Sequence, residues 1–142
     1  MKRGLLSTIA CAGLLMLSWA AGTAAAQSNR DDESWYRTRD SYFTGNDWKM
    51  RLFERVRLDL DHVQTVAFAG TDEYRIVRTK EQVGELQGKL AEGRYDQPEL
   101  DEVIAGLERV VADNRLTARD YDMLNDDLNR VRDYRAHHED WH

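Results

Sequence analysis

Residues 92–99, Glu-Gly-Arg-Tyr-Asp-Gln-Pro-Glu, are the segment most informative about the fold, because they carry the signals that end one α-helix and start another. Gly93 is the residue type that most readily enters the left-handed conformation closing a helix. Asp96 is a favoured N-cap, and Glu99, three residues later, completes a capping box with it. Pro98 falls in the first turn of the new helix, where its missing N–H leaves no hydrogen bond unmade. The stretch therefore predicts a tight corner between two packed helices.

The same pattern returns further along the chain, so that residues 83–101 and 104–122 form an internal repeat with a period of 21. In the second copy, Asn114 is predicted to close a helix in the left-handed conformation. Thr117 and Asp120 form the second capping box. The two corners separate three predicted helices, at about 80–92, 97–113 and 118–138.

An earlier helix is predicted at about 47–64, where apolar side chains recur every three or four residues. This period is lost near Thr65, and short apolar runs flank Gly70 within residues 65–78. We predict a short β-hairpin in that interval, with an irregular loop as the alternative. The predicted fold class is therefore mostly α, a small four-helix domain over residues 47–142 with a possible hairpin between its first two helices.

Two glycines and one histidine admit a functional interpretation but favour a structural one. Gly84 and Gly88 lie four residues apart on one face of the helix predicted at 80–92. Close packing of neighbouring helices is the prediction for this pair, and contact with a partner's helix is the alternative. His62 lies among charged neighbours, so we expect it at the surface.

The N-terminus has the three-part layout of a secretory signal peptide. Lys2-Arg3 forms a positive start, residues 5–19 are mostly apolar, and Ala24-Ala25-Ala26 offers small residues for cleavage. We expect residues 1–26 to be removed. The apolar run is too short to span a bilayer comfortably, so we expect no stable membrane insertion after cleavage. The sequence therefore predicts a periplasmic or secreted protein.

Cys11 is the one cysteine of the chain, and it lies inside the apolar run. Lipid attachment is the functional interpretation, but the preceding Thr8-Ile9-Ala10 lacks the leucine usual in such sites. Cleavage after Ala26 would leave no thiol for a disulfide, a nucleophile or a metal site.

Residues 27–46 are predicted to be a flexible or strap-like N-terminal segment. Residues 27–34 are polar and show no apolar period, which is typical of a tether. Four aromatic side chains follow: Trp35, Tyr36, Tyr42 and Phe43. Since aromatic side chains bury large areas, we expect them to cover the helices as a strap, with a peptide-like binding element as the alternative.

The charge balance restricts the class of partner. The chain has 20 Lys and Arg against 26 Asp and Glu, a formal net charge of −6. Removing residues 1–26 takes away Lys2 and Arg3 and no acidic residue, so the mature charge is −6 − 2 = −8. Such a chain repels phosphate backbones and anionic lipid, so nucleic acid is not an expected partner.

The C-terminus reads His138-Glu139-Asp140-Trp141-His142, a literal His-Glu-x-x-His motif. On a helix, His138 and His142 would share one face and hold zinc, with Glu139 polarising a water. A hydrolase needs a third ligand, however, and the second histidine lies where helices fray. We therefore expect a solvated helix end, and keep His137, His138 and His142 as weak candidates for metal binding. No cofactor is expected.

Two segments resemble the Leu-Thr-x-x-Gln motif of Spy-like periplasmic chaperones, which are small exported helical proteins. They are Thr79-Lys80-Glu81-Gln82, preceded by Arg78 in place of leucine, and Leu116-Thr117-Ala118-Arg119-Asp120, with Asp120 in place of glutamine. The resemblance implies an exported helical fold and a chaperone activity. In both segments the motif also serves as a helix-start signal, with Thr79 and Gln82 expected to cap the helix at 80–92.

The predicted function is an exported, non-enzymatic helical module with a binding or scaffolding role in the cell envelope, acting on an unknown protein partner. The alternative is a Spy-like periplasmic chaperone or a metal-responsive envelope protein. A more remote alternative is a zinc-dependent hydrolase using the terminal His-Glu-x-x-His. No set of residues in the sequence has the spacing of a nucleophile site or a phosphate-binding loop.

Overall fold

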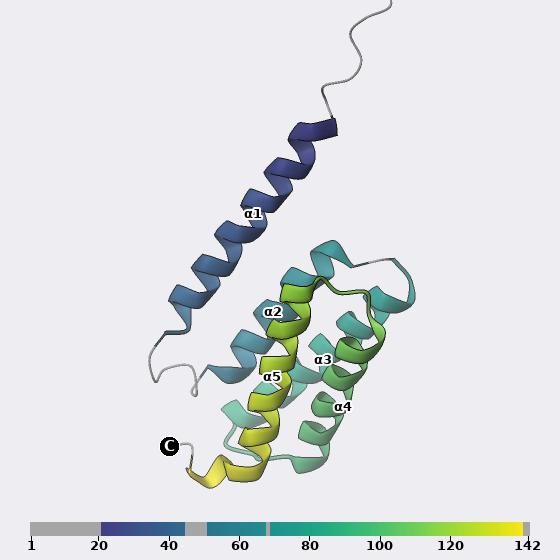
Figure 1. Cartoon of the computed structure of the whole chain (residues 1–142). Helices are drawn as coiled ribbons and strands as arrows, with labels where there is room; N and C mark the ends of the chain where they lie inside the picture. The colour runs from purple at the N-terminus through teal and green to yellow at the C-terminus, as the bar shows by residue number, and fades with distance from the viewer. Residues whose placement is uncertain (1–20, 45–50, 68, 141–142) are drawn as a thin grey trace, which may run out of the picture. The chain divides into compact units, whose positions relative to one another are not determined.

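The computed structural model describes residues 21–44, 51–67 and 69–140, and all its regular structure is helical (Figure 1). This confirms the mostly α fold class. The elements in chain order are α1 (Ala21–Tyr42), α2 (Leu52–Val66), α3 (Thr71–Ala91), α4 (Gln97–Asp113), α5 (Ala118–His137) and a 3₁₀ turn, η2 (His138–Asp140). The chain divides into two compact units, Met1–Tyr42 and Phe43–His142.

Helix α1 belongs to the first unit and was not predicted. Residues 27–42 of the segment predicted to be flexible or strap-like lie within this helix. That their aromatic side chains cover the other helices stays a prediction. Local interactions account for the helix, since residues 23–44 contain no glycine or proline and Arg37 Nε lies 3.5 Å from Glu33 Oε1, one turn away. Residues 1–20 and 45–46 lie outside the described residues, and cleavage after Ala26 stays a prediction.

Helices α2 to α5 form the packed part of the second unit. Each packs against the next along the chain, and α5 returns against α2, as Figure 1 shows. Their apolar stripes meet in a core of aliphatic side chains, which supplies the main stabilisation of the bundle. The most deeply buried of these are Leu52, Val56, Leu60, Val63, Ile76, Val83, Leu86, Leu100, Val103, Leu107, Val110 and Leu124.

The hairpin predicted at residues 65–78 is wrong. Helix α2 continues to Val66, and α3 begins at Thr71, nine residues before the predicted start at 80. The stripe of α3 runs through Ile76, Thr79, Val83 and Leu86, all buried. Because its second member is polar, the apolar period was not visible in the sequence.

Thr79 does not cap a helix, contrary to the prediction made from its spacing to Gln82. It lies in the middle of α3, where its hydroxyl donates to the carbonyl oxygen of Arg75 at 2.8 Å. The helix start lies instead after Gly70, which has a φ of +93°, and is followed by the acidic first-turn residues Asp72 and Glu73.

The two predicted corners are present. Asp96 accepts from the backbone N–H of Glu99 at 3.1 Å, and Thr117 accepts from that of Asp120 at 3.1 Å, so both N-caps are confirmed. Gly93 adopts the left-handed conformation, with a φ of +74°. The boundaries of α4 and α5 therefore fall within a residue of those predicted from capping alone.

Asn114 does not adopt the predicted left-handed conformation. Its φ of −85° and ψ of 150° are extended. The reason is tertiary, because its side-chain amide donates to the carbonyl oxygen of Asp72 at 3.0 Å and its amide oxygen accepts from Arg75 at 3.2 Å. Asn114 therefore ties the second corner to the start of α3.

The close approach of helices occurs at a glycine other than the two predicted. A Cβ atom added at Gly84 or Gly88 would have no neighbouring atom within 4 Å. A Cβ atom on Gly106 of α4 would lie 2.8 Å from the hydroxyl of Thr79 and 2.9 Å from Oε1 of Gln82. The predicted packing role of the first two glycines is therefore wrong, and Gly106 lets α3 and α4 approach.

Candidate functional site

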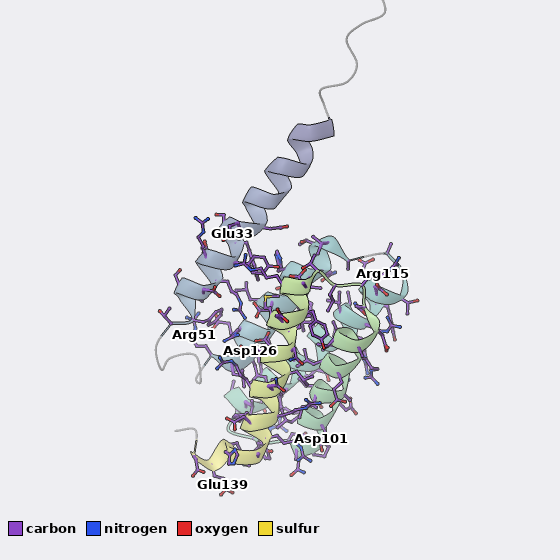
Figure 2. All side chains as sticks on the ribbon, viewed as in Figure 1. Glu33, Arg51, Asp101, Arg115, Asp126 and Glu139 are labelled. Atoms are coloured by element: carbon purple, nitrogen blue, oxygen red, sulfur yellow. The ribbon has the colours of Figure 1, made fainter. Side chains whose placement is uncertain are left out.

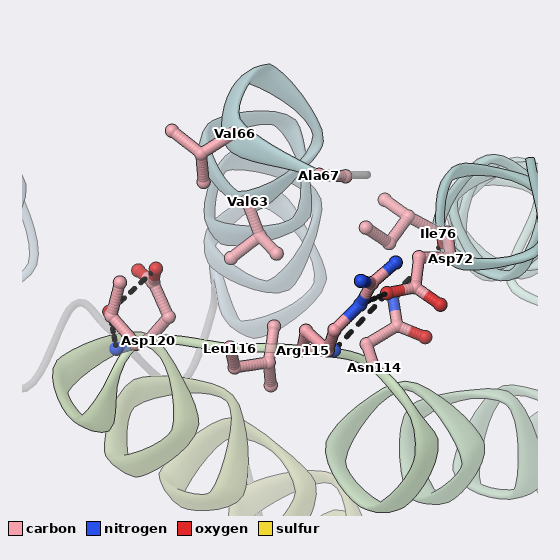
Figure 3. Close-up of a pocket in the computed structure, with 10 residues that line it drawn as sticks. Val63, Val66, Ala67, Asp72, Ile76, Asn114, Arg115, Leu116 and Asp120 are labelled. Carbon is pink, nitrogen blue, oxygen red and sulfur yellow. Dashed lines mark hydrogen bonds and ion pairs between the residues drawn. The ribbon is translucent and has the colours of Figure 1, made fainter. Parts of the chain in front are cut away.

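A pocket of about 310 Å³ opens at the end of the bundle where α2 ends, α3 begins and the α4–α5 corner crosses (Figure 3). It lies within the second unit, at the end marked by Arg115 and opposite to Glu139 in Figure 2. The residues that line it are Val63, Val66, Ala67, Asp72, Ile76, Asn114, Arg115, Leu116, Thr117 and Asp120.

The interior of the pocket is apolar. Val63 and Ile76 belong to the core of the bundle and are almost fully buried. Leu116 faces them from the α4–α5 corner, as Figure 3 shows. Val66 completes the wall and is 51% exposed. An apolar surface thus continues from the core to solvent, which is typical of a site that receives an apolar group.

Asp72 organises one side of the rim. Its Oδ2 accepts from the backbone N–H of Arg115 at 3.2 Å and lies 3.5 Å from Arg115 Nε. Its Oδ1 accepts from Arg75 Nη1 at 3.3 Å. Together with the amide of Asn114, these contacts join the first turn of α3 to the α4–α5 corner. The shape of the pocket therefore depends on tertiary hydrogen bonds as well as on helix packing.

Asp120 organises the opposite side. Its Oδ2 accepts from the hydroxyl of Thr117 at 2.8 Å, which links the two residues of the predicted capping box through their side chains. Its Oδ1 lies 3.6 Å from Nε2 of His62 on α2, and these side chains are only 3% and 9% exposed. The expected surface position of His62 is therefore wrong, because the packing of α2 on α5 covers it.

Exposed apolar side chains are concentrated at this end of the bundle. The large apolar residues exposed in the described part of the chain are Tyr42, Val66, Tyr74, Tyr95 and Tyr121. Of these, Val66 ends α2, while Tyr74 and Tyr121 lie in the first two turns of α3 and α5. The pocket and the residues that line it form the candidate binding surface, which we call the pocket end.

Sequence reasoning missed the pocket end because it assigned residues 65–78 to a hairpin. One signal could have located it. Asp72 and Glu73 follow Gly70, and acidic residues after a glycine are typical of a helix start. Placing that start at 71 would have brought the end of α2, the start of α3 and the second corner to one end of the bundle.

A buried charge cluster joins α2 to α5 away from the pocket. The guanidinium of Arg55 donates to Asp126 at 2.6 Å and lies 3.0 Å from Asp127 and 3.9 Å from Asp59. Asp59 and Asp127 are fully buried. Burial opposes ionisation of Asp126, but the guanidinium of Arg130 and that of Arg55 outweigh it and lower the pKa of that carboxyl. The cluster fixes how α2 and α5 meet.

The two candidate metal ligands that the structure describes, His137 and His138, each contact another side chain. His138 stacks on Tyr95, with ring centroids 3.8 Å apart, and Nδ1 of His137 lies 3.1 Å from a carboxylate oxygen of Asp133. Helix α5 ends at His137, so the His-Glu-x-x-His motif does not continue on that α-helix, and His142 lies outside the described residues. In the described ranges, no group of three or more His, Cys, Asp or Glu side chains could hold a metal ion.

Burial also affects two tyrosines beside these histidines. Desolvation raises the pKa of Tyr134 and of Tyr95, and the nearby Arg135 guanidinium partly opposes the shift at Tyr95. Phe53 packs edge-on against Tyr134, at 5.2 Å between ring centroids. This aromatic cluster holds the C-terminal turn against the first corner.

Comparison with known proteins does not assign the chain to a family. No protein-family model matches the chain, and neither a curated protein nor a solved structure is significantly similar to it. Among the helices of the described residues, none is both long enough and apolar enough to cross a membrane.

Proposed function

We propose that this chain is an exported, non-enzymatic helical module that binds a protein partner in the cell envelope through its pocket end. The proposal of export is supported by the signal-peptide pattern of residues 1–26. The proposal of binding is supported by one observation above the others: the apolar pocket continues from the core to exposed Val66 and has a polar rim.

The dimensions of the pocket suit an anchoring side chain. At about 310 Å³, it lies at the lower limit of the roughly 300–1,000 Å³ typical of small-molecule sites. Protein interfaces commonly concentrate their binding energy in one or a few apolar side chains that fill such a pocket, with polar groups around them. A leucine or phenylalanine of a partner would enter this pocket and cover Val66, with room left for a neighbouring group.

Each alternative function predicts a different experimental result. A Spy-like chaperone would suppress the aggregation of an unfolded client, although Thr79 in α3 does not serve as the motif's helix start. A metal-responsive protein would show a rise in melting temperature with zinc or copper that depends on residues 137–142. A zinc-dependent hydrolase through the terminal motif is the least supported, since α5 ends at His137.

Export and binding are tested together in cells that secrete the full chain. The mature protein should appear in the envelope fraction with a mass corresponding to a start at Gln27. Crosslinking in the envelope should capture a defined partner with the wild-type chain and with Ala112→Leu, a substitution at an exposed site on α4. The variant Ala67→Leu, which places a larger side chain in the pocket, should lose that partner while keeping its helical content. Retention of the chain in the cytosol, or unchanged capture with Ala67→Leu, would refute the proposal.

A further inference from the structure

We infer that the pocket end binds a cationic segment of a protein, one that places a single aliphatic or aromatic side chain in the pocket and basic side chains on its rim. This inference rests on the proposed function and specifies the chemistry of the partner. It follows from the shape of the pocket taken together with the distribution of charge around it.

The charge of the whole chain favours a basic partner. With 26 acidic against 20 basic residues, its field attracts cations and repels anions, and such a field raises association rates for partners of opposite charge. An acidic segment, an anionic membrane or a nucleic acid would approach against this field.

Three carboxylates and two guanidinium groups lie at the pocket, so its net charge is also negative; they are Asp72, Asp113, Asp120, Arg75 and Arg115. The basic residues beside it face carboxylates of the bundle: Arg75 lies near Asp72 and Asp113, and Arg115 lies near Asp72. On the opposite side, Asp120 lines the pocket. The two guanidinium groups are therefore paired with carboxylates of the bundle itself.

Exposed carboxylates extend the acidic surface outward from the pocket. Glu73 and Asp122 are exposed. Glu73 directly follows Asp72 in the first turn of α3, and Asp122 lies two residues after Asp120 in α5. Arg119 lies on the same turn of α5 and reduces this excess of negative charge without reversing it. A basic side chain beside the anchored apolar group would therefore meet carboxylates on two helices.

The test uses the purified full chain and short synthetic peptides, with binding measured by calorimetry at two salt concentrations. One peptide has a central leucine flanked by lysines, a second has glutamates in place of the lysines, and a third has serine in place of the leucine. The first should bind, with an affinity that falls as salt rises, and the second should bind about tenfold or more weakly. The third should show no binding.

Variants of the chain locate the binding and separate local from overall charge. Ala67→Leu should abolish binding of the lysine-flanked peptide, and Ala112→Leu should not. The pair Glu73→Gln with Asp122→Asn should weaken binding roughly threefold to tenfold. The pair Glu81→Gln with Glu85→Gln removes the same charge from exposed sites elsewhere on α3 and should leave the affinity unchanged.

Three results would overturn the inference: equal or tighter binding of the glutamate-flanked peptide, an equal loss with both neutralised pairs, or no binding of any peptide. If one of these occurred while Ala67→Leu still abolished capture of the envelope partner, the partner would bind at the pocket without being cationic. The proposed function would then stand, and only the chemistry of the partner would be wrong.

Discussion

Gly106 is the position where a single methyl group should matter most to the packing of this bundle. In Gly106→Ala the new Cβ would lie 2.8 Å from the hydroxyl oxygen of Thr79, 3.1 Å from its methyl group and 2.9 Å from Oε1 of Gln82. Neither neighbour can move freely. The Thr79 hydroxyl is bonded to the carbonyl oxygen of Arg75, and Nε2 of Gln82 donates to Glu102 at 3.0 Å.

Two effects of opposite sign set the magnitude for Gly106→Ala. Replacing a helical glycine by alanine stabilises a helix by roughly 0.5–1 kcal/mol. Overpacking a filled core costs about 1–3 kcal/mol, and the contacts below 3.0 Å place this site in that range. We therefore expect a net loss of up to roughly 2.5 kcal/mol in the free energy of unfolding, the cost of overpacking less the gain in helix propensity.

Urea denaturation followed by circular dichroism measures this loss, with Gly84→Ala as the matched control. A Cβ atom at Gly84 meets nothing within 4 Å, so the same substitution in α3 should stabilise the chain by roughly 0.5–1 kcal/mol. Thr79→Ala should be less costly in the Gly106→Ala background than in the wild type, because it removes both clashing Thr79 atoms. If Gly106→Ala is as stable as Gly84→Ala, the close approach of α3 and α4 is not as the structure has it.

The other predictions concern the charge cluster, the second corner and the dependence of stability on pH. Arg55→Met should lower the free energy of unfolding by about 3–5 kcal/mol in chemical denaturation, because it leaves the carboxylates of Asp59 and Asp127 buried beside an apolar group. The control Arg57→Met, at an exposed site on the same helix, should change that free energy little. Thr117→Ala removes the N-cap of α5 and should cost about 1 kcal/mol; a value near zero would mean that the cap is dispensable. Side-chain hydrogen bonds from Lys89 and Arg135 lower the pKa values of Asp96 and Asp101, as the cluster arginines do for Asp126. A carboxyl group whose pKa is lowered in the folded state stabilises that state above the unfolded pKa of about 4. Melting temperatures should therefore fall as the pH drops below that value. An unchanged melting temperature down to pH 2 would contradict these ion pairs.

Local chemistry determined much of this protein before any packing was considered. The caps at Asp96 and Thr117 and the left-handed Gly93 place the boundaries of α4 and α5, because each signal acts within four residues of the chain. The apolar stripe of α2 was also visible in the sequence, because its apolar side chains recur every three or four residues. The start of α3 was not, since its buried face includes polar Thr79 and Gln82, which only contact with Gly106 of α4 explains.

The candidate site belongs almost entirely to the tertiary structure. The pocket forms where the end of α2, the start of α3 and the second corner meet, and its lining residues run from Val63 to Asp120, a separation of 120 − 63 = 57 positions. Asn114 shows the difference most directly. Its residue type favours a left-handed helix end, but hydrogen bonds to Asp72 and Arg75 hold it extended. Helix ends could be located from the chain alone, because capping is local. Which side chains face one another, and so where a partner could bind, depended on how the helices pack.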